Sequence, residues 1–195
     1  MSNCAICNIH ACNNSQTPEN CSLASVEHDN IKNEYMEDEN FKIAKQSTLC
    51  VSYDKTRLEE IIDFSRNCGY KKIGLAFCIG LAEEAKMLNK ILEHNGFNVS
   101  SIICKVGNIP KDFIGAPKAA ASMCNPIKQA EMLNEMKTDF NILLGLCVGH
   151  DSLFIKYSNA PITVFAVKDR VLAHNTLGAI YQAESFYKKK FFPEK

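Results

Sequence analysis

Short apolar runs alternate with amphipathic stretches along most of this chain. Residues 72–77, 99–103, 140–146 and 162–167 have the length and the content of branched and aromatic side chains that are typical of buried strands. The stretches between them repeat apolar residues at helical spacing, most clearly over residues 81–94. Strands that alternate with helices in this way predict βαβ units and a mostly parallel sheet.

Local signals fix several of the expected helix ends. Thr56 and Glu59 have the spacing of a capping box, and Gly69 is placed to end the helix that follows. Pro126, directly after Asn125, occupies a position that the first turn of a helix tolerates.

The tail is expected to add a short edge strand at residues 171–173 and a closing helix over about residues 177–187. We therefore expect residues 51–195 to form a Rossmann-like three-layer α/β domain with a mostly parallel sheet of four to five strands.

The first 30 residues have a different pattern, with few large apolar side chains to bury. They carry four cysteines in the spacing C-x2-C-x4-C-x8-C, at Cys4, Cys7, Cys12 and Cys21. Four thiolates satisfy a tetrahedral zinc ion or an iron–sulfur centre, and the binding energy can fold such a segment. We expect a metal-binding module at residues 1–30, followed by a helical linker at residues 31–50.

The spacing of these N-terminal cysteines identifies the ligands better than the metal. It matches neither a symmetrical zinc ribbon nor the regular runs of ferredoxins, and His10 is an alternative ligand. We favour zinc at this site, with an iron–sulfur centre as the alternative.

Composition restricts the partners and the compartment. The 22 Lys and Arg residues balance 22 Asp and Glu residues, so no positive field attracts nucleic acid or an anionic membrane. The first residues do not resemble a secretion signal, and no apolar run approaches the roughly 18 residues of a membrane span. We expect a cytoplasmic protein, in which ten cysteines indicate metal or thiol chemistry rather than disulfides.

Four cysteines in the body of the chain lie where predicted strands end. Cys78, Cys104 and Cys147 each directly follow a strand, and Cys124 stands just before the helix that begins near Pro126. Ligands of open α/β sheets bind outside the carboxyl ends of the strands, so these strand-end cysteines are expected to converge on a second metal or iron–sulfur centre. We favour iron–sulfur here and interpret the two other cysteines, Cys50 and Cys68, as structural.

Polar and charged residues follow the same strand ends. His150 and Asp151 come shortly after Cys147, and the three together would suit thiol catalysis with His150 as the base. Six further residues would suit an anionic cluster or ligand and are the expected cofactor-binding set: Lys105, Lys168, Asp169, Arg170, His174 and Asn175. The structural alternative is that Lys168 and Asp169 form the turn of a hairpin and that Asn175 caps the last helix.

Several of these segments resemble a prokaryotic family of cysteine-rich metal-binding proteins, domain of unknown function 1847. The likeness covers nearly the whole chain and rests on the N-terminal cysteines and on five segments: 77–81, 104–107, 124–127, 145–151 and 167–175. The resemblance implies metal binding but no particular reaction.

The leading hypothesis is a cytoplasmic metalloprotein whose second centre serves redox or ligand chemistry with a small molecule or a redox partner. Neither a G-x-G-x-x-G fingerprint nor a phosphate-loop lysine motif is present in the sequence. One alternative is a zinc-stabilised binding module without catalysis, in which the strand-end thiols only pack. The other is thiol catalysis by Cys147 with His150.

Overall fold

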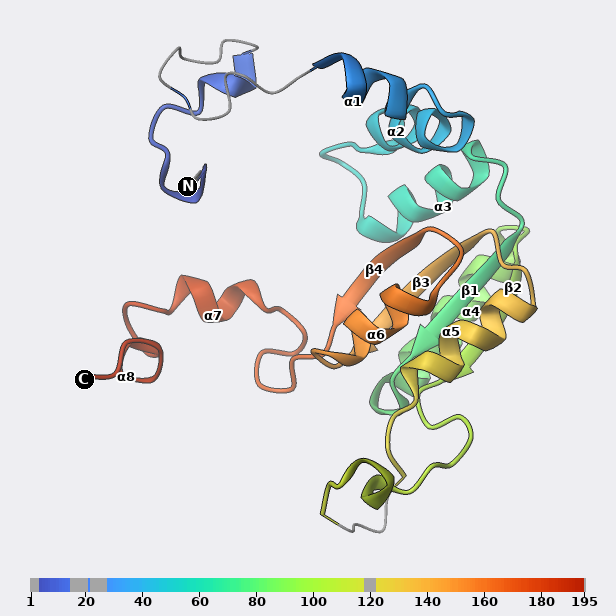
Figure 1. The fold of residues 1–195 in the computed structure, drawn as a ribbon, viewed down its shortest axis with the longest axis vertical. Coiled ribbons are helices and arrows are strands. Elements are labelled where there is room, and N and C mark those ends of the chain that lie inside the picture. Colours follow the sequence, from blue (N-terminus) through green and yellow to red (C-terminus); the bar gives the residue numbers. More distant parts are fainter. Residues whose placement is uncertain (1–3, 15–20, 22–27, 118–121, 195) are drawn as a thin grey trace. The chain divides into compact units, whose positions relative to one another are not determined.

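The computed structural model of the chain describes residues 4–14, 21, 28–117 and 122–194, and it divides into two units (Figure 1). Met1–Leu49 is the smaller unit and Cys50–Lys195 the larger. Within the first stretch, two short 3-10 helices carry cysteines, η1 (Cys4–Ile6) and η2 (Ala11–Asn14). The helices α1 (His28–Tyr35) and α2 (Asp38–Cys50) follow. The metal-binding module expected over residues 1–30 lies partly outside the described residues.

The larger unit is built on a sheet of four parallel strands. These are β1 (Lys72–Phe77), β2 (Asn98–Ile103), β3 (Phe140–Leu146) and β4 (Ile162–Val167). The strand order is β2-β1-β3-β4, and every neighbouring pair is parallel. The Rossmann-like three-layer α/β fold expected from the sequence is confirmed.

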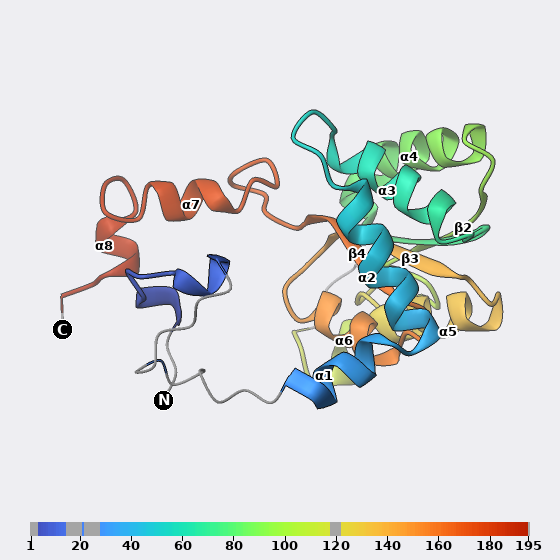
Figure 2. The ribbon, with the colours of Figure 1, turned by 90° about the horizontal axis from the view of Figure 1, so that it is seen from above.

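Helices cover both faces of this sheet (Figures 1 and 2). On one face, α3 (Arg57–Asn67) and α4 (Ala82–His94) pack against apolar side chains of β1 and β3. On the other face, α5 (Pro126–Glu135) and α6 (His150–Tyr157) bury Ala130, Leu133 and Phe154 against the sheet. Since β2 and β3 lie on opposite sides of β1, the point where strand order reverses lies between β1 and β3.

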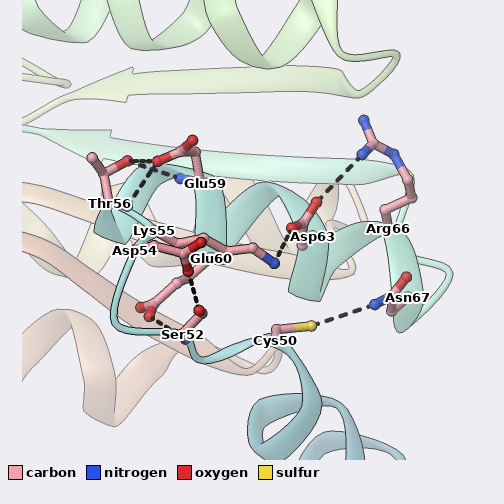
Figure 3. Close-up of polar contacts among 10 residues, drawn as sticks. All are labelled: Cys50, Ser52, Asp54, Lys55, Thr56, Glu59, Glu60, Asp63, Arg66 and Asn67. Atoms are coloured by element: carbon pink, nitrogen blue, oxygen red, sulfur yellow. Dashed lines mark hydrogen bonds and ion pairs between the residues drawn. The ribbon is translucent and has the colours of Figure 1, made fainter.

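The expected helix signals act as predicted. The Thr56 hydroxyl accepts the N–H of Glu59, while the Glu59 carboxylate accepts the N–H of Thr56, which completes the capping box of α3 (Figure 3). At the start of α5, the Asn125 side chain accepts the N–H of Lys128, and Pro126 follows in the first turn. These caps fix the helix starts on both sides of the sheet.

The tail departs from the prediction. No strand forms at residues 171–173, because Asp169 Oδ1 accepts the N–H groups of Val171 and Leu172, and Ala173 has a left-handed φ of 49°. Lys168 and Asp169 therefore lead into a turn that is not part of a hairpin. The expected closing helix is divided into α7 (Leu177–Tyr181), whose N-cap is Thr176 rather than Asn175, and α8 (Lys188–Phe191).

Candidate functional site

Cys78 and Cys104 lie level with each other at the ends of two neighbouring strands. Phe77 is in register with Ile103, and the N–H of Cys104 donates to the carbonyl of Phe77 at 2.9 Å. Ala76 and Ile102, two residues earlier, both belong to the apolar cluster under α5. Since strand side chains alternate between faces, the cysteines follow positions directed toward α5.

A closed loop brings Cys124 to the same place. The N–H of Asn125 donates to the carbonyl of Cys104 at 2.8 Å, which joins the two ends of the loop. Lys105 Nζ donates to the carbonyl of Ser122 at 2.6 Å, and Asn125 Nδ2 donates to the carbonyl of Val106 at 3.3 Å. The loop between β2 and α5 is therefore fixed at its neck, with one cysteine on each side.

Cys104 stands in contact with the other two thiols. Its side chain is only 2% exposed, and the N–H of Ile79 donates to its sulfur at 3.4 Å. Burial raises the pKa of the Cys104 thiol to about 12, with smaller contributions in the same direction from the nearby Cys124 thiol, which is hydrogen-bonded to it, and from the Cys78 thiol. The N–H of Ile79 acts in the opposite direction and lowers this pKa. Three of the four strand-end cysteines are thus neighbours.

Cys147, the fourth strand-end cysteine, lies farther along its strand. The N–H of Cys78 donates to the carbonyl of Leu144 at 3.1 Å, so Cys147 comes after the level of Cys78. Gly145, with a φ of 67°, marks an irregularity in the pairing of β3 with β4 just before it. Cys147 Sγ, partly exposed, accepts a hydrogen bond from Arg170 Nη2 at 3.7 Å.

The His150 imidazole is partly buried and is affected by the charges of Lys105 and Asp151. Burial lowers the pKa of His150, and the charge of Lys105 lowers it further, while Asp151 opposes this effect. Asp151 accepts the N–H of Ser152 at 2.8 Å in the first turn of α6. Among the described residues, the hydrogen bonds do not include one between the His150 imidazole and Cys147 Sγ.

The residues after β4 divide into two groups. Asp169 and His174 hold the turn together, because the N–H of Asp169 donates to His174 Nδ1 at 3.0 Å. Asn175 continues this turn by donating its N–H to the carbonyl of Leu172. Lys168, in contrast, extends its ammonium across the sheet edge toward Gly80 and Gly145.

Gln129 is a residue of this site that the sequence interpretation missed. It is fully buried on α5, and its Nε2 donates to the carbonyls of Ile102 at 2.7 Å and Phe77 at 3.3 Å. Because both of these acceptors need the amide nitrogen, the orientation of the amide is fixed, and Oε1 has no partner among the residues that the structure describes. The sequence signal that could have identified Gln129 is a polar side chain at a position of the helix that faces the apolar core.

The N-terminal cysteines lie in a less enclosed environment. Cys4 and Cys12 are exposed, whereas Cys7 and Cys21 are partly buried. N–H groups of His10 and Ile9 hydrogen-bond to the Cys7 sulfur and lower the pKa of this thiol. The same two donors favour thiolate, the form in which cysteine binds metals.

The remaining two cysteines, Cys50 and Cys68, are buried in other parts of the larger unit. Cys68 is 6% exposed within the apolar cluster under α3 and α4, and Cys50 is 3% exposed and accepts a hydrogen bond from Asn67 (Figure 3). Among the described residues, no group of three or more His, Cys, Asp or Glu side chains is arranged so that it could hold a metal ion. None of the described helices has the length and apolarity to cross a membrane.

Comparison with known proteins gives a consistent family. The family described as "Protein of unknown function (DUF1847)" matches residues 20–165. A relative from Methanocaldococcus jannaschii, "Uncharacterized protein MJ0455", is 50% identical over 199 residues, covering 98% of this chain and 99% of the relative. No solved structure matches the chain. The extent of both sequence matches shows that the chain belongs to the DUF1847 family.

Proposed function

We propose that the protein binds a metal or an iron–sulfur centre at the edge of the sheet, with Cys78, Cys104 and Cys124 as ligands and Cys147 as the fourth. The observation that carries this proposal is the position of Cys104, buried beside two other thiols from separate elements. Such a centre would serve redox or ligand chemistry in a reducing compartment such as the cytoplasm.

The strand-end thiols of the described residues do not form a metal site as they stand, but their chemistry suits a thiolate-bound cation. The pKa of Cys104, about 12, keeps this thiol protonated at neutral pH unless a positive charge offsets its burial. Each cysteine sulfur moves by rotation about one bond among three staggered positions, and such rotation is required to bring the thiols onto a common ion. The unpartnered Oε1 of Gln129 adds a buried acceptor beside the same strand ends.

The surroundings favour an iron–sulfur centre over zinc at this edge. Thiolate serves both, but a cluster with a net negative charge is stabilised by nearby cations, which Lys105 and Arg170 supply. When bound, it would supply electron transfer or polarisation of a ligand. The N–H of Ile79 would still hydrogen-bond to the Cys104 sulfur and orient this ligand.

For the smaller unit, we propose a zinc site formed by Cys4, Cys7, Cys12 and Cys21. The N–H donors at the Cys7 sulfur support it, because they favour the charged form of one ligand before metal is bound. The small apolar content of this segment gives the metal a structural role.

Anaerobic purification followed by iron, zinc and sulfide analysis and a visible spectrum tests the sheet-edge centre. Cys104→Ala and Cys78→Ala are expected to remove the iron and the visible absorption while zinc remains. Cys68→Ala is the matched control, since Cys68 is 6% exposed and Cys78 is 7% exposed. Equal metal content in all three variants and the parent protein would contradict the proposal.

A second candidate function is thiol chemistry at Cys147. The hydrogen bond from Arg170 to Cys147 Sγ favours a reactive thiolate, and the thiol is only partly buried. In this case Cys147 would react with iodoacetamide faster than Cys68, and Arg170→Met would slow the reaction. A Cys147 that reacts no faster than Cys68 would exclude it.

A further inference from the structure

The Lys168 side chain reaches from the end of β4 over two glycines on other elements. Its Nζ lies 3.3 Å from the position that a Cβ on Gly80 would occupy, and 3.6 Å from the corresponding position on Gly145. Gly145 belongs to β3, and Gly80 follows β1 within the short helix η3 (Ile79–Leu81). The ammonium therefore lies where strand order reverses, the usual place of ligands in such sheets.

The absence of side chains at Gly80 and Gly145 leaves room for the Lys168 ammonium, and at Gly80 also for the Cys78 thiol. A Cβ on Gly80 would also lie 3.9 Å from Cys78 Sγ, so the ammonium and this thiol border the same space. Gly80 does not have a left-handed φ, whereas Gly145 does. The absence of a side chain at residue 80 is thus a matter of space and not of backbone conformation.

The Lys168 ammonium has no partner within the part of the chain that the structure describes. Neither an ion pair nor a hydrogen bond involves its Nζ there, although the residue is partly buried. The adjacent carboxylate of Asp169 accepts backbone N–H groups of the following turn. An ammonium that no described side chain engages is available to an anionic ligand, which would form a charge-assisted hydrogen bond with it.

We propose that Lys168, lying over Gly80 and Gly145, binds a small oxyanion, the carboxylate or phosphate group of a ligand, beside Cys78. This inference goes beyond the proposed metal centre, because the anion is held by the ammonium and does not require a metal. It also defines the chemical class of ligand that reaches the sheet edge.

Calorimetric titration of the full-length protein with inorganic phosphate and, separately, with acetate tests the inference and distinguishes the two oxyanions. Lys168→Met is expected to weaken binding of the preferred anion at least about tenfold, because a charge-assisted hydrogen bond is lost. Lys90→Met is the control, since Lys90 is exposed on α4. Gly80→Ala is expected to weaken binding severalfold by displacing the ammonium, whereas Gly178→Ala adds only an ordinary contact with Leu172.

The outcomes separate this inference from the proposed metal centre. Wild-type affinity weaker than about 1 mM for both anions would overturn the inference, as would equal binding by Lys168→Met and Lys90→Met. If Lys168→Met instead loses iron without a change in anion binding, the lysine serves the thiolate centre and the inference is wrong. Anion binding that persists in Cys104→Ala would support the inference even where the metal centre fails.

Discussion

The two groups of cysteines in this protein differ in how much buried structure surrounds them. Of the N-terminal cysteines, Cys4 and Cys12 lie on short 3-10 helices and are exposed, whereas Cys7 and Cys21 lie outside these helices. The strand-end cysteines follow strands of a sheet whose central strand β3 is buried along its whole length. Under the proposed function, a metal would organise the chain around the first group, whereas an apolar core already positions the second group.

This difference predicts that metal removal has different consequences in the two units. The N-terminal segment has few apolar side chains to bury, so the proposed zinc site would couple metal binding to its folding. The parallel sheet folds through the burial of apolar side chains on both faces. The strand-end thiols are therefore expected to contribute little to its free energy of folding.

The largest effect is expected from Cys7→Ser in the smaller unit. Structural zinc sites contribute roughly 10–16 kcal/mol of binding free energy, most of which is lost with one ligand. Limited proteolysis with mass spectrometry should show rapid cleavage within residues 1–49 and an intact fragment from the larger unit. Ser2→Ala, which changes a residue near this site without removing a thiol, is the control. Unchanged protection of residues 1–49 in Cys7→Ser would contradict a structural role for the metal.

In the larger unit, the largest loss should come from the apolar core. Phe154 is fully buried under the sheet, and Phe154→Ala is expected to lower the free energy of unfolding by about 3–5 kcal/mol. Cys104→Ala, which removes one small side chain, should cost clearly less in metal-free protein. Chemical denaturation followed by circular dichroism measures both. A greater loss for Cys104→Ala would mean that the thiols organise this unit too.

The contrast also explains which features the sequence could predict. The strands and the caps at Thr56 and Asn125 depend on local patterns, and they form as expected. The strand predicted at residues 171–173 is wrong, because a side-chain cap from Asp169 outweighs three apolar residues without a partner strand.

The composition of the site was less accessible to sequence reasoning. Cys78 and Cys104 were placed correctly at the strand ends because a parallel sheet aligns those ends. Cys147 lies beyond the level of Cys78 because the register of β1 with β3 pairs Phe77 with Leu144, and the crossing of Lys168 to Gly80 depends on side-chain conformation. Neither leaves a periodic signal in the sequence. The role of Gln129 could not be predicted for a related reason, since it depends on the hydrogen bonds that its amide makes with the carbonyl groups of Phe77 and Ile102.

A smaller effect is expected from Gln129→Leu, which removes the unpartnered acceptor near the thiols. If Oε1 serves a donor at the metal centre, the metal affinity should fall about 10–100-fold, as is usual when partners of metal ligands are lost. Competition with a chromogenic chelator measures this affinity.

Asn141→Leu is the matched control for Gln129→Leu. Asn141 is an equally buried amide whose Oδ1 accepts from Thr138 and whose Nδ2 donates to Ser158. Its replacement is expected to lower stability and leave the metal affinity unchanged. An equal loss of affinity in both variants would show that Gln129 acts only through the fold.

The smallest effect concerns the charge environment at the sheet edge. Lys105→Met should raise the pKa of His150 toward its ordinary value of 6.5, because the second cause of its lowered pKa is removed while burial remains. In the wild-type protein, the folded state binds the His150 proton more weakly than the unfolded chain does. This contribution to stability is therefore complete above pH 6.5 and is lost as the pH falls toward the lowered pKa, and Lys105→Met should reduce that loss. Titration of the imidazole by NMR checks the shift, and Lys90→Met provides the control for a lysine on the exposed face of α4. An unchanged His150 pKa in Lys105→Met would mean that the charge of Lys105 does not contribute to the lowered pKa of His150.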